Sequence, residues 1–176
     1  MARNIEIKAA VADLDALKTR VAEIADGGPW RIEQHDIFFN CANGRLKLRC
    51  FADGSAELIV YRRPDATGPK ACDYERSPVS DPQSMRRLLA RSNGVRGEVI
   101  KTRTLFMAGR TRIHLDHVVG LGDYMELEVV LGAEESIAQG RAEAEQLMRR
   151  LAIDDDALVD GAYIDLIEAG EGATGG

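Results

Sequence analysis

Apolar and charged residues alternate with a period of two over many short stretches of this chain. Near the N-terminus, Asn4, Glu6 and Lys8 alternate with Ile5 and Ile7, and a strand would point these two sets of side chains to opposite faces. Similar alternation recurs along the sequence and predicts further strands. We expect strands at residues 3–10, 31–39, 44–51, 56–63, 71–78, 98–108, 110–118 and 124–132.

Turn and helix signals lie between these stretches. The pairs Asn43-Gly44 and Asp53-Gly54 are typical of hairpin turns. Apolar residues at helical spacing predict helices from residue 14 to the Gly27-Gly28-Pro29 stop, over 82–92 and over 137–151, with short helical segments between 154 and about 169. Strands joined mainly by hairpins predict an α+β fold, namely an eight-stranded antiparallel β-barrel that forms a tunnel, with helices packed outside.

Composition narrows the class of protein. The 176 residues are 45% hydrophobic, which suffices for one core, so we expect a single domain over residues 1–169 and a flexible tail over 170–176. A net charge of −6 argues against general nucleic-acid binding, and no stretch is apolar enough for a membrane span. Three cysteines without CxxC spacing favour a reducing, cytoplasmic location. Homodimerisation through an exposed strand or outer helix is compatible with the pattern.

The sign of the charges is segregated on several predicted strand faces. One face carries Arg45, Lys47 and Arg49, another carries Arg110, Arg112, His114 and Asp116, and a third carries Glu126 and Glu128. Solvent-exposed faces usually mix signs, because like neighbours repel. If these faces converge inside a barrel, the charges must pair, stay hydrated or bind a highly charged ligand. A polyphosphate chelated by a divalent metal meets that requirement, because arginine and lysine bind phosphoryl oxygens and carboxylates bind Mg²⁺ or Mn²⁺.

Other chemistries find less support. A charged face on an ordinary sheet would simply meet water, so a structural or partner-binding barrel is the plainest alternative. No serine lies in a GxSxG nucleophile elbow, and Gly120-Leu-Gly122 is too short for a dinucleotide-binding loop. The histidines lack metal-ligand spacing. We interpret His114 as a polar tunnel residue and place His35 and His117 on the surface.

Six motifs occur in an order that resembles a known superfamily. They are Asn4-Ile-Glu-Ile-Lys8, Arg45-Leu-Lys-Leu-Arg49, Glu57-Leu-Ile-Val-Tyr-Arg-Arg-Pro64, Lys101-Thr-Arg103, Arg112-Ile-His-Leu-Asp116 and Leu121-Gly-Asp-Tyr-Met-Glu-Leu-Glu128. Over residues 3–168 the chain resembles the CYTH, or triphosphate tunnel metalloenzyme, superfamily, and within it the class IV adenylyl cyclase-like branch.

The resemblance implies a set of site residues and a cofactor, Mg²⁺ or Mn²⁺. The implied catalytic residues are Glu6, Lys8, Glu126 and Glu128, and the implied metal ligands are Glu6, Asp116, Glu126 and Glu128. The implied triphosphate-binding residues are Lys8, Arg45, Lys47, Arg49, Arg62, Arg63, Lys101, Arg103 and Arg112, with the choice between Arg62 and Arg63 left open. One departure is Asn4, which stands where the superfamily has the first carboxylate of its ExExK motif. An amide brings no charge, so one metal site should be weaker.

The resemblance also implies a function. We expect a metal-dependent enzyme of the class IV adenylyl cyclase type, converting ATP to cyclic AMP and pyrophosphate. The alternatives are a phosphohydrolase acting on tripolyphosphate, thiamine triphosphate or nucleoside triphosphates, and a non-catalytic module that binds polyphosphate or nucleotides. The expected partner is therefore a small molecule bearing a triphosphate, with neither nucleic acid nor membrane involved.

Overall fold

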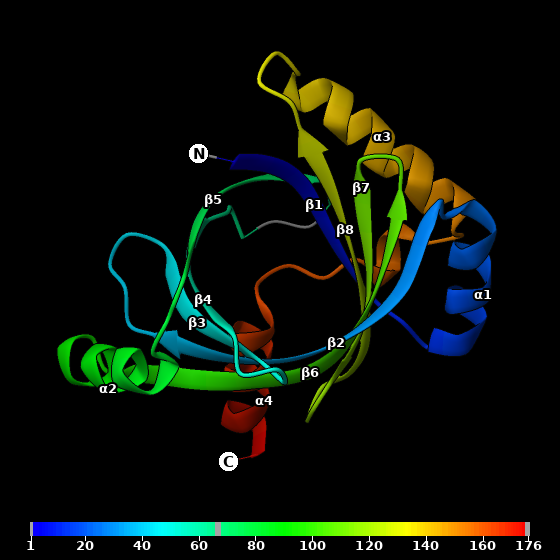
Figure 1. Ribbon diagram of the computed structural model, residues 1–176. Helices are drawn as coiled ribbons and strands as arrows, with labels where there is room; N and C mark the ends of the chain where they lie inside the picture. Colours follow the sequence, from blue (N-terminus) through cyan, green and yellow to red (C-terminus); the bar gives the residue numbers. More distant parts are fainter. Residues whose placement is uncertain (1, 66–67, 175–176) are drawn as a thin grey trace.

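Eight antiparallel strands close into a barrel in the computed structural model, which describes residues 2–65 and 68–174 (Figure 1). Around the barrel the order is β1-β5-β4-β3-β2-β6-β7-β8. The strands are β1 (Ala2–Ala10), β2 (Gly27–Phe39), β3 (Arg45–Phe51), β4 (Ala56–Arg62), β5 (Lys70–Pro78), β6 (Val95–Ala108), β7 (Thr111–Val118) and β8 (Gly122–Leu131). The predicted fold class is confirmed.

Four α-helices and one short 3₁₀ helix connect or follow the strands. They are α1 (Leu14–Ile24), α2 (Pro82–Ser92), α3 (Ile137–Arg150), η1 (Asp155–Ala157) and α4 (Tyr163–Thr174). The side chains of Asp13, Asp81 and Ser136 cap the first three α-helices by accepting a backbone N–H. Among the described residues, no helix has both the length and the apolar character needed to span a bilayer.

Several boundaries differ from those predicted. Strand β2 starts at Gly27, directly after α1, and a register shift before Trp30 accommodates Gly28-Pro29. Helix α4 continues to Thr174, past the predicted end near Ala169, because no proline interrupts this segment. Residues 175–176 of the predicted tail lie outside the described residues. Arg110 lies in the turn before β7, so it does not share the face of Arg112 as predicted; it pairs instead with Glu135 and Glu143.

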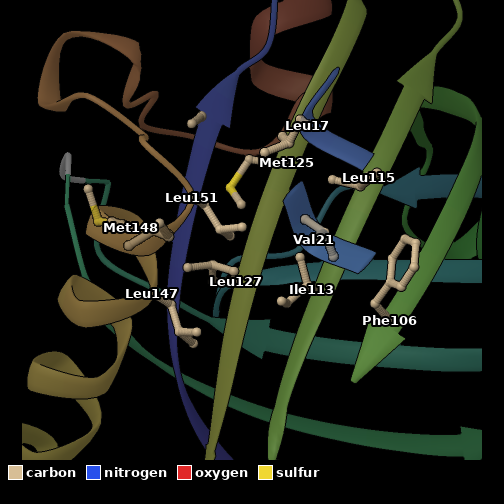
Figure 2. Close-up of a cluster of buried hydrophobic side chains, with 12 residues drawn as sticks. Leu17, Val21, Phe106, Ile113, Leu115, Met125, Leu127, Leu147, Met148 and Leu151 are labelled. Carbon is tan, nitrogen blue, oxygen red and sulfur yellow. The ribbon is translucent and has the colours of Figure 1, made fainter. Parts of the chain in front are cut away.

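The hydrophobic core lies between the outer barrel wall and two helices. Figure 2 shows Leu17 and Val21 of α1, Leu147 of α3 and its C-cap residue Leu151 packed against apolar side chains of the barrel wall. Among these wall residues, Ile113 and Leu127 are 0% exposed. Gly140 lets α3 approach closely, since a Cβ there would lie 2.7 Å from Ile5 and Leu131 side chains. The apolar residues of the alternating pattern thus pack against the helices on the outside of the barrel, and the charged residues that alternate with them face its interior.

In the view of Figure 1, helix α4 crosses behind β6, with its C-terminal end below that strand. Tyr163 and Ile164, at its start, are buried in a cluster with Phe38 and Val99. Gly97 makes room for this contact, because a Cβ at residue 97 would lie 2.6 Å from Ile164 Cδ1. The start of α4 therefore forms part of the wall of the barrel interior.

Candidate active site in the barrel interior

The barrel encloses a cavity of about 400 Å³. All eight strands contribute side chains to its lining, together with Ala162 and Tyr163 at the start of α4. Charged side chains dominate the lining: Lys8, Lys47, Arg49, Arg63, Arg76, Lys101, Arg103 and Arg112, with Glu6, Asp36, Glu57, Glu126 and Glu128. Charged faces that are distant in sequence are therefore gathered around one enclosed space.

Strand register places the charged rows opposite one another. On β1 and β8, Glu6 faces Glu128 and Lys8 faces Glu126. The row continues onto β7, where Arg112 faces Glu128 and His114 faces Glu126. Two carboxylates directly opposite each other repel unless a cation lies between or beside them. Arg63 Nη1 donates to Glu6 Oε2 at 2.7 Å, and Arg112 Nη1 donates to Glu128 Oε2 at 3.2 Å.

Glu126 and Glu128 are only partly exposed but remain ionised. Burial alone would raise the pKa of Glu126, but Lys8 and Arg103 outweigh it and hold that pKa well below its usual range. Arg103 Nη2 donates to Glu126 Oε2 at 2.7 Å, and Lys8 Nζ lies 3.4 Å from Glu126 Oε1. Burial likewise opposes the ionisation of Glu128, whose pKa is nonetheless lowered by His114 and Arg103.

Three side chains form a group that could hold a metal ion. One ligand atom each of His114, Glu126 and Glu128 lies within 4.8 Å of the others. The carboxylates supply hard oxygen donors of the kind that divalent cations prefer. Asn4 adds a buried amide oxygen with no hydrogen-bond partner within residues 2–65 and 68–174, which also suits a cation or a solvated ligand. Two of the four predicted metal ligands, Glu126 and Glu128, fall in this group, and Glu6 lies opposite Glu128.

Asp116, the fourth predicted ligand, is engaged elsewhere. Its carboxylate is fully buried and accepts from Arg103 Nε at 2.7 Å and Arg103 Nη2 at 2.6 Å, while the Tyr163 hydroxyl donates to it at 2.9 Å. Burial works against ionisation, but Arg103 and Lys101 lower the pKa of Asp116 to about 2. This geometry gives Asp116 the task of holding Arg103 in place beneath Glu126.

Asp36 plays the same part for the β3 cations, and the sequence reasoning missed it. Its carboxylate accepts from Arg49 Nε and Nη2 at 2.7 and 2.8 Å and from Lys47 Nζ at 2.8 Å. Although burial opposes ionisation, Arg49 and Lys47 hold the pKa of Asp36 well below its usual range. Strand pairing could have identified Asp36, because it lies directly opposite Arg49 in the β2–β3 hairpin and so shares its face of the sheet.

Three of the predicted phosphate ligands, Arg45, Arg62 and Arg63, lie in different surroundings. Arg45 is not among the residues that line the cavity and pairs with Asp65 and Asp165, both at 2.7 Å. Arg62 is exposed and donates to the Asn43 carbonyl, whereas its neighbour Arg63 lines the cavity. The open choice between the two arginines is thus decided by strand parity, which turns alternate side chains of β4 inward.

The loop that leads into α4 fixes the remaining cations. Lys8 Nζ donates to the Gly161 carbonyl at 3.0 Å, and Arg63 Nη2 donates to the same oxygen at 2.6 Å. The Lys8 ammonium also lies 3.9 Å from the centre of the Tyr163 ring, a cation–π contact. Burial and the neighbouring Arg103 lower the pKa of Lys101 to about 7. The contact between Lys8 and the Gly161 carbonyl could not be predicted from the sequence, because the two residues are more than 150 positions apart.

The CYTH domain model matches residues 2–163, almost the whole barrel. This chain belongs to the CYTH domain family. The predicted superfamily is therefore confirmed. Within the family, the chain is 24% identical over 174 residues to the adenylate cyclase CyaB of Aeromonas hydrophila, covering 94% of this chain and 88% of the relative.

Solved structures share the CYTH barrel at low sequence identity. The PH1012 protein of Pyrococcus horikoshii OT3 superposes with a TM-score of 0.84 and 22% identity, covering 93% of this chain and 99% of that one. HpAC1 of Hippeastrum superposes with a TM-score of 0.69 and 14% identity, covering 97% and 96% of the two chains; it is described as having a dominant triphosphatase activity. These likenesses establish the fold.

Proposed function

We propose that this CYTH protein is a divalent-metal-dependent enzyme that cleaves a triphosphate chain, with the cyclisation of ATP to cyclic AMP and pyrophosphate as its first candidate reaction. The observation that carries the proposal is the cavity, in which Lys8, Lys101 and Arg103 act on the ionised Glu126 and Lys47, Arg49, Arg63 and Arg112 add further cations to the lining. Surplus buried cations of this kind need an anion, and a triphosphate supplies several phosphoryl oxygens in a line.

The lining residues divide into two tasks. Lys8, Arg49, Arg63, Arg103 and Arg112 would bind phosphoryl oxygens and neutralise the charge that develops on the leaving phosphate. Asp36 and Asp116 would keep two of these guanidinium groups in position before the substrate arrives. A metal ion held by Glu126 and Glu128, with Glu6 close by, would supply Lewis-acid charge and lower the pKa of the attacking hydroxyl.

Two features favour an organic triphosphate over inorganic tripolyphosphate. The cavity also has apolar lining residues, namely Ile32, Phe51, Ile59 and Leu105, which an inorganic polyphosphate does not need but a nucleobase would contact. The relative CyaB, which matches over most of the chain, is an adenylate cyclase. The second candidate is hydrolysis of the triphosphate by water, which the likeness to HpAC1 supports. The two reactions differ in the nucleophile and in the phosphorus that it attacks. In cyclisation a ribose hydroxyl attacks the α-phosphorus and pyrophosphate leaves, whereas in hydrolysis a water attacks the terminal phosphorus and phosphate is released.

Product analysis tests the proposal and separates the two reactions. Purified protein is incubated with ATP, thiamine triphosphate or tripolyphosphate, each with Mg²⁺ or Mn²⁺, and cyclic AMP, pyrophosphate and phosphate are measured. We expect equal amounts of cyclic AMP and pyrophosphate from ATP. Phosphate without cyclic AMP would select the hydrolase. Thermal stabilisation by these compounds without turnover would mean a binding module, and no effect of any kind would refute the proposal.

Lys101 predicts a pH dependence of binding. Because its pKa lies at about 7 in the free protein, Lys101 loses its charge as the pH rises through 7, and a bound polyanion would restore that charge. The complex therefore holds more protons than the free protein between pH 7 and the ordinary lysine pKa of about 10.4. We expect affinity for tripolyphosphate to fall above pH 7, by up to about tenfold per pH unit.

Calorimetry in two buffers of different ionisation enthalpy measures this linkage. At pH 8 the wild-type protein should take up close to one proton on binding tripolyphosphate. A Lys101→Arg variant keeps its charge at every pH tested, so its uptake should be near zero and its affinity should vary less with pH. Equal proton uptake by the two proteins would show that Lys101 does not meet the ligand.

A further inference from the structure

His114 Nδ1 is a buried nitrogen that has no hydrogen-bond partner among the described residues. The residue is only 4% exposed and lies on β7, facing the cavity. Its Nδ1 is 3.6 Å from Glu126 Oε2 and 3.8 Å from Glu128 Oε1, both longer than an N–H···O hydrogen bond. An unpartnered polar atom at such depth is costly. The arrangement therefore calls for something that sits between the ring and the two carboxylates.

The spacing of these atoms fits one metal ion. Bonds of about 2.1 Å from a metal to nitrogen and oxygen ligands place neighbouring ligand atoms about 3.0 Å apart at right angles and about 4.2 Å apart when opposite. The two distances from His114 Nδ1 fall inside that range. The β7–β8 ladder fixes the arrangement, since His114 lies directly opposite Glu126.

The basic side chains that contact Glu126 and Glu128 are compatible with metal binding by these carboxylates. Arg103 donates to Glu126 Oε2, Lys8 lies beside Glu126 Oε1, and Arg112 donates to Glu128 Oε2. A carboxylate oxygen has two lone pairs, so it can accept such a hydrogen bond while it ligates a metal. The contacts then orient the two carboxylates rather than exclude the ion.

We propose that His114 Nδ1 is a direct metal ligand beside Glu126 and Glu128, which makes this a mixed nitrogen–oxygen site that selects Mn²⁺ over Mg²⁺. The inference rests on the proposed metal-dependent function and refines it. Mg²⁺ strongly prefers oxygen donors, whereas first-row transition ions accept imidazole as well as carboxylate. Replacing an oxygen ligand by an imidazole therefore moves the preference of the site away from Mg²⁺.

Pulsed electron paramagnetic resonance of the Mn²⁺-loaded protein tests the nitrogen ligand directly. We expect a ¹⁴N coupling typical of imidazole in the wild-type protein, and its replacement by a ¹⁵N coupling after labelling with ¹⁵N-histidine. This measurement needs no variant, so it stands even if a substitution impairs folding. Mn²⁺ that binds with no histidine nitrogen coupling would overturn the inference.

Two histidine variants assign the coupling. The His114→Gln variant should lose it and bind Mn²⁺ at least about tenfold more weakly, because even an outer-shell partner of a metal ligand is typically worth that much. Its affinity for Mg²⁺ should change by less than the affinity for Mn²⁺. The matched control is His117→Gln, since His117 is exposed and pairs with Asp123; this variant should keep both the coupling and the affinity. Retention of the coupling in His114→Gln would overturn the inference.

These results are independent of turnover. An Mn²⁺ centre with His114 coupling but without turnover of any triphosphate would support the ligand assignment and refute the proposed enzyme. Turnover that runs equally well on Mg²⁺, with no nitrogen coupling, would refute the ligand assignment and leave the proposed function standing.

Discussion

Replacing Glu126 by glutamine is expected to lower metal-dependent turnover at least about a hundredfold, the usual scale for removing one preorganised electrostatic group. The amide is nearly the same size, so the cavity keeps its shape. The lost charge is what matters, because Glu126 is held ionised between Lys8 and Arg103. Without it, the metal group keeps one carboxylate and the surrounding cations lose their internal counter-charge. Glu128→Gln should behave similarly, since it removes the other carboxylate of the group.

Initial rates with ATP and Mn²⁺, measured over a range of metal concentrations, check this prediction. A weakened metal site shows as a raised metal requirement, and a lost one as a lower maximal rate at every concentration. The matched control is Glu75→Gln, because Glu75 is an exposed carboxylate on β5. Near-normal rates for Glu126→Gln would remove Glu126 from the site.

The Asp116→Ala variant is expected to lose about 3–5 kcal/mol of stability, which is typical when one partner of a buried ion pair is removed. Asp116 is 0% exposed and balances Arg103, with Lys101 at 3.8 Å. Its removal leaves these cations buried together and deprives the Tyr163 hydroxyl of its acceptor. For a chain of this length the melting temperature should fall by roughly 10 °C.

Thermal or denaturant unfolding of four proteins measures this effect. Wild type, Asp116→Ala, Arg103→Ala and the double variant form a cycle, and a strong coupling predicts that the double variant costs far less than the two single costs added together. Asp73→Ala provides the control, because Asp73 is exposed on β5. If the Asp116 and Asp73 variants were equally stable, the buried pair would not support the barrel.

The alternation of apolar and charged residues with a period of two predicted most of the strands. Apolar residues such as Ile113 and Leu127 fell on one face and charged residues such as Arg112 and Glu128 on the other. Hairpin turns at Gly44 and Gly54 indicated the β2–β3 and β3–β4 pairs, whereas closure of the barrel depends on pairs between strands that are distant in sequence, namely β1–β5, β1–β8 and β2–β6. Where alternation was broken by a turn, as at Arg110, the inferred face was wrong.

The candidate site was harder, because strand parity does not say which charges pair. Asp36 was overlooked although it faces the predicted Arg49, and the contact of Asp116 with Arg103 was not predicted. Arg45 lies on the same predicted face, yet it pairs with Asp165 of the distant helix α4 and is not among the residues that line the cavity. Such pairings depend on the distances between side chains from different elements, which a single sequence does not contain.

The central claim is that the barrel interior binds a triphosphate, and calorimetric titration with tripolyphosphate in the presence of Mn²⁺ tests it most directly. We predict one site per chain, with affinity at least about tenfold weaker in Arg49→Gln, whose guanidinium lines the cavity, and unchanged in Arg141→Gln, whose side chain is exposed on α3. No measurable binding to the wild-type protein, or equal loss in both variants, would contradict the account.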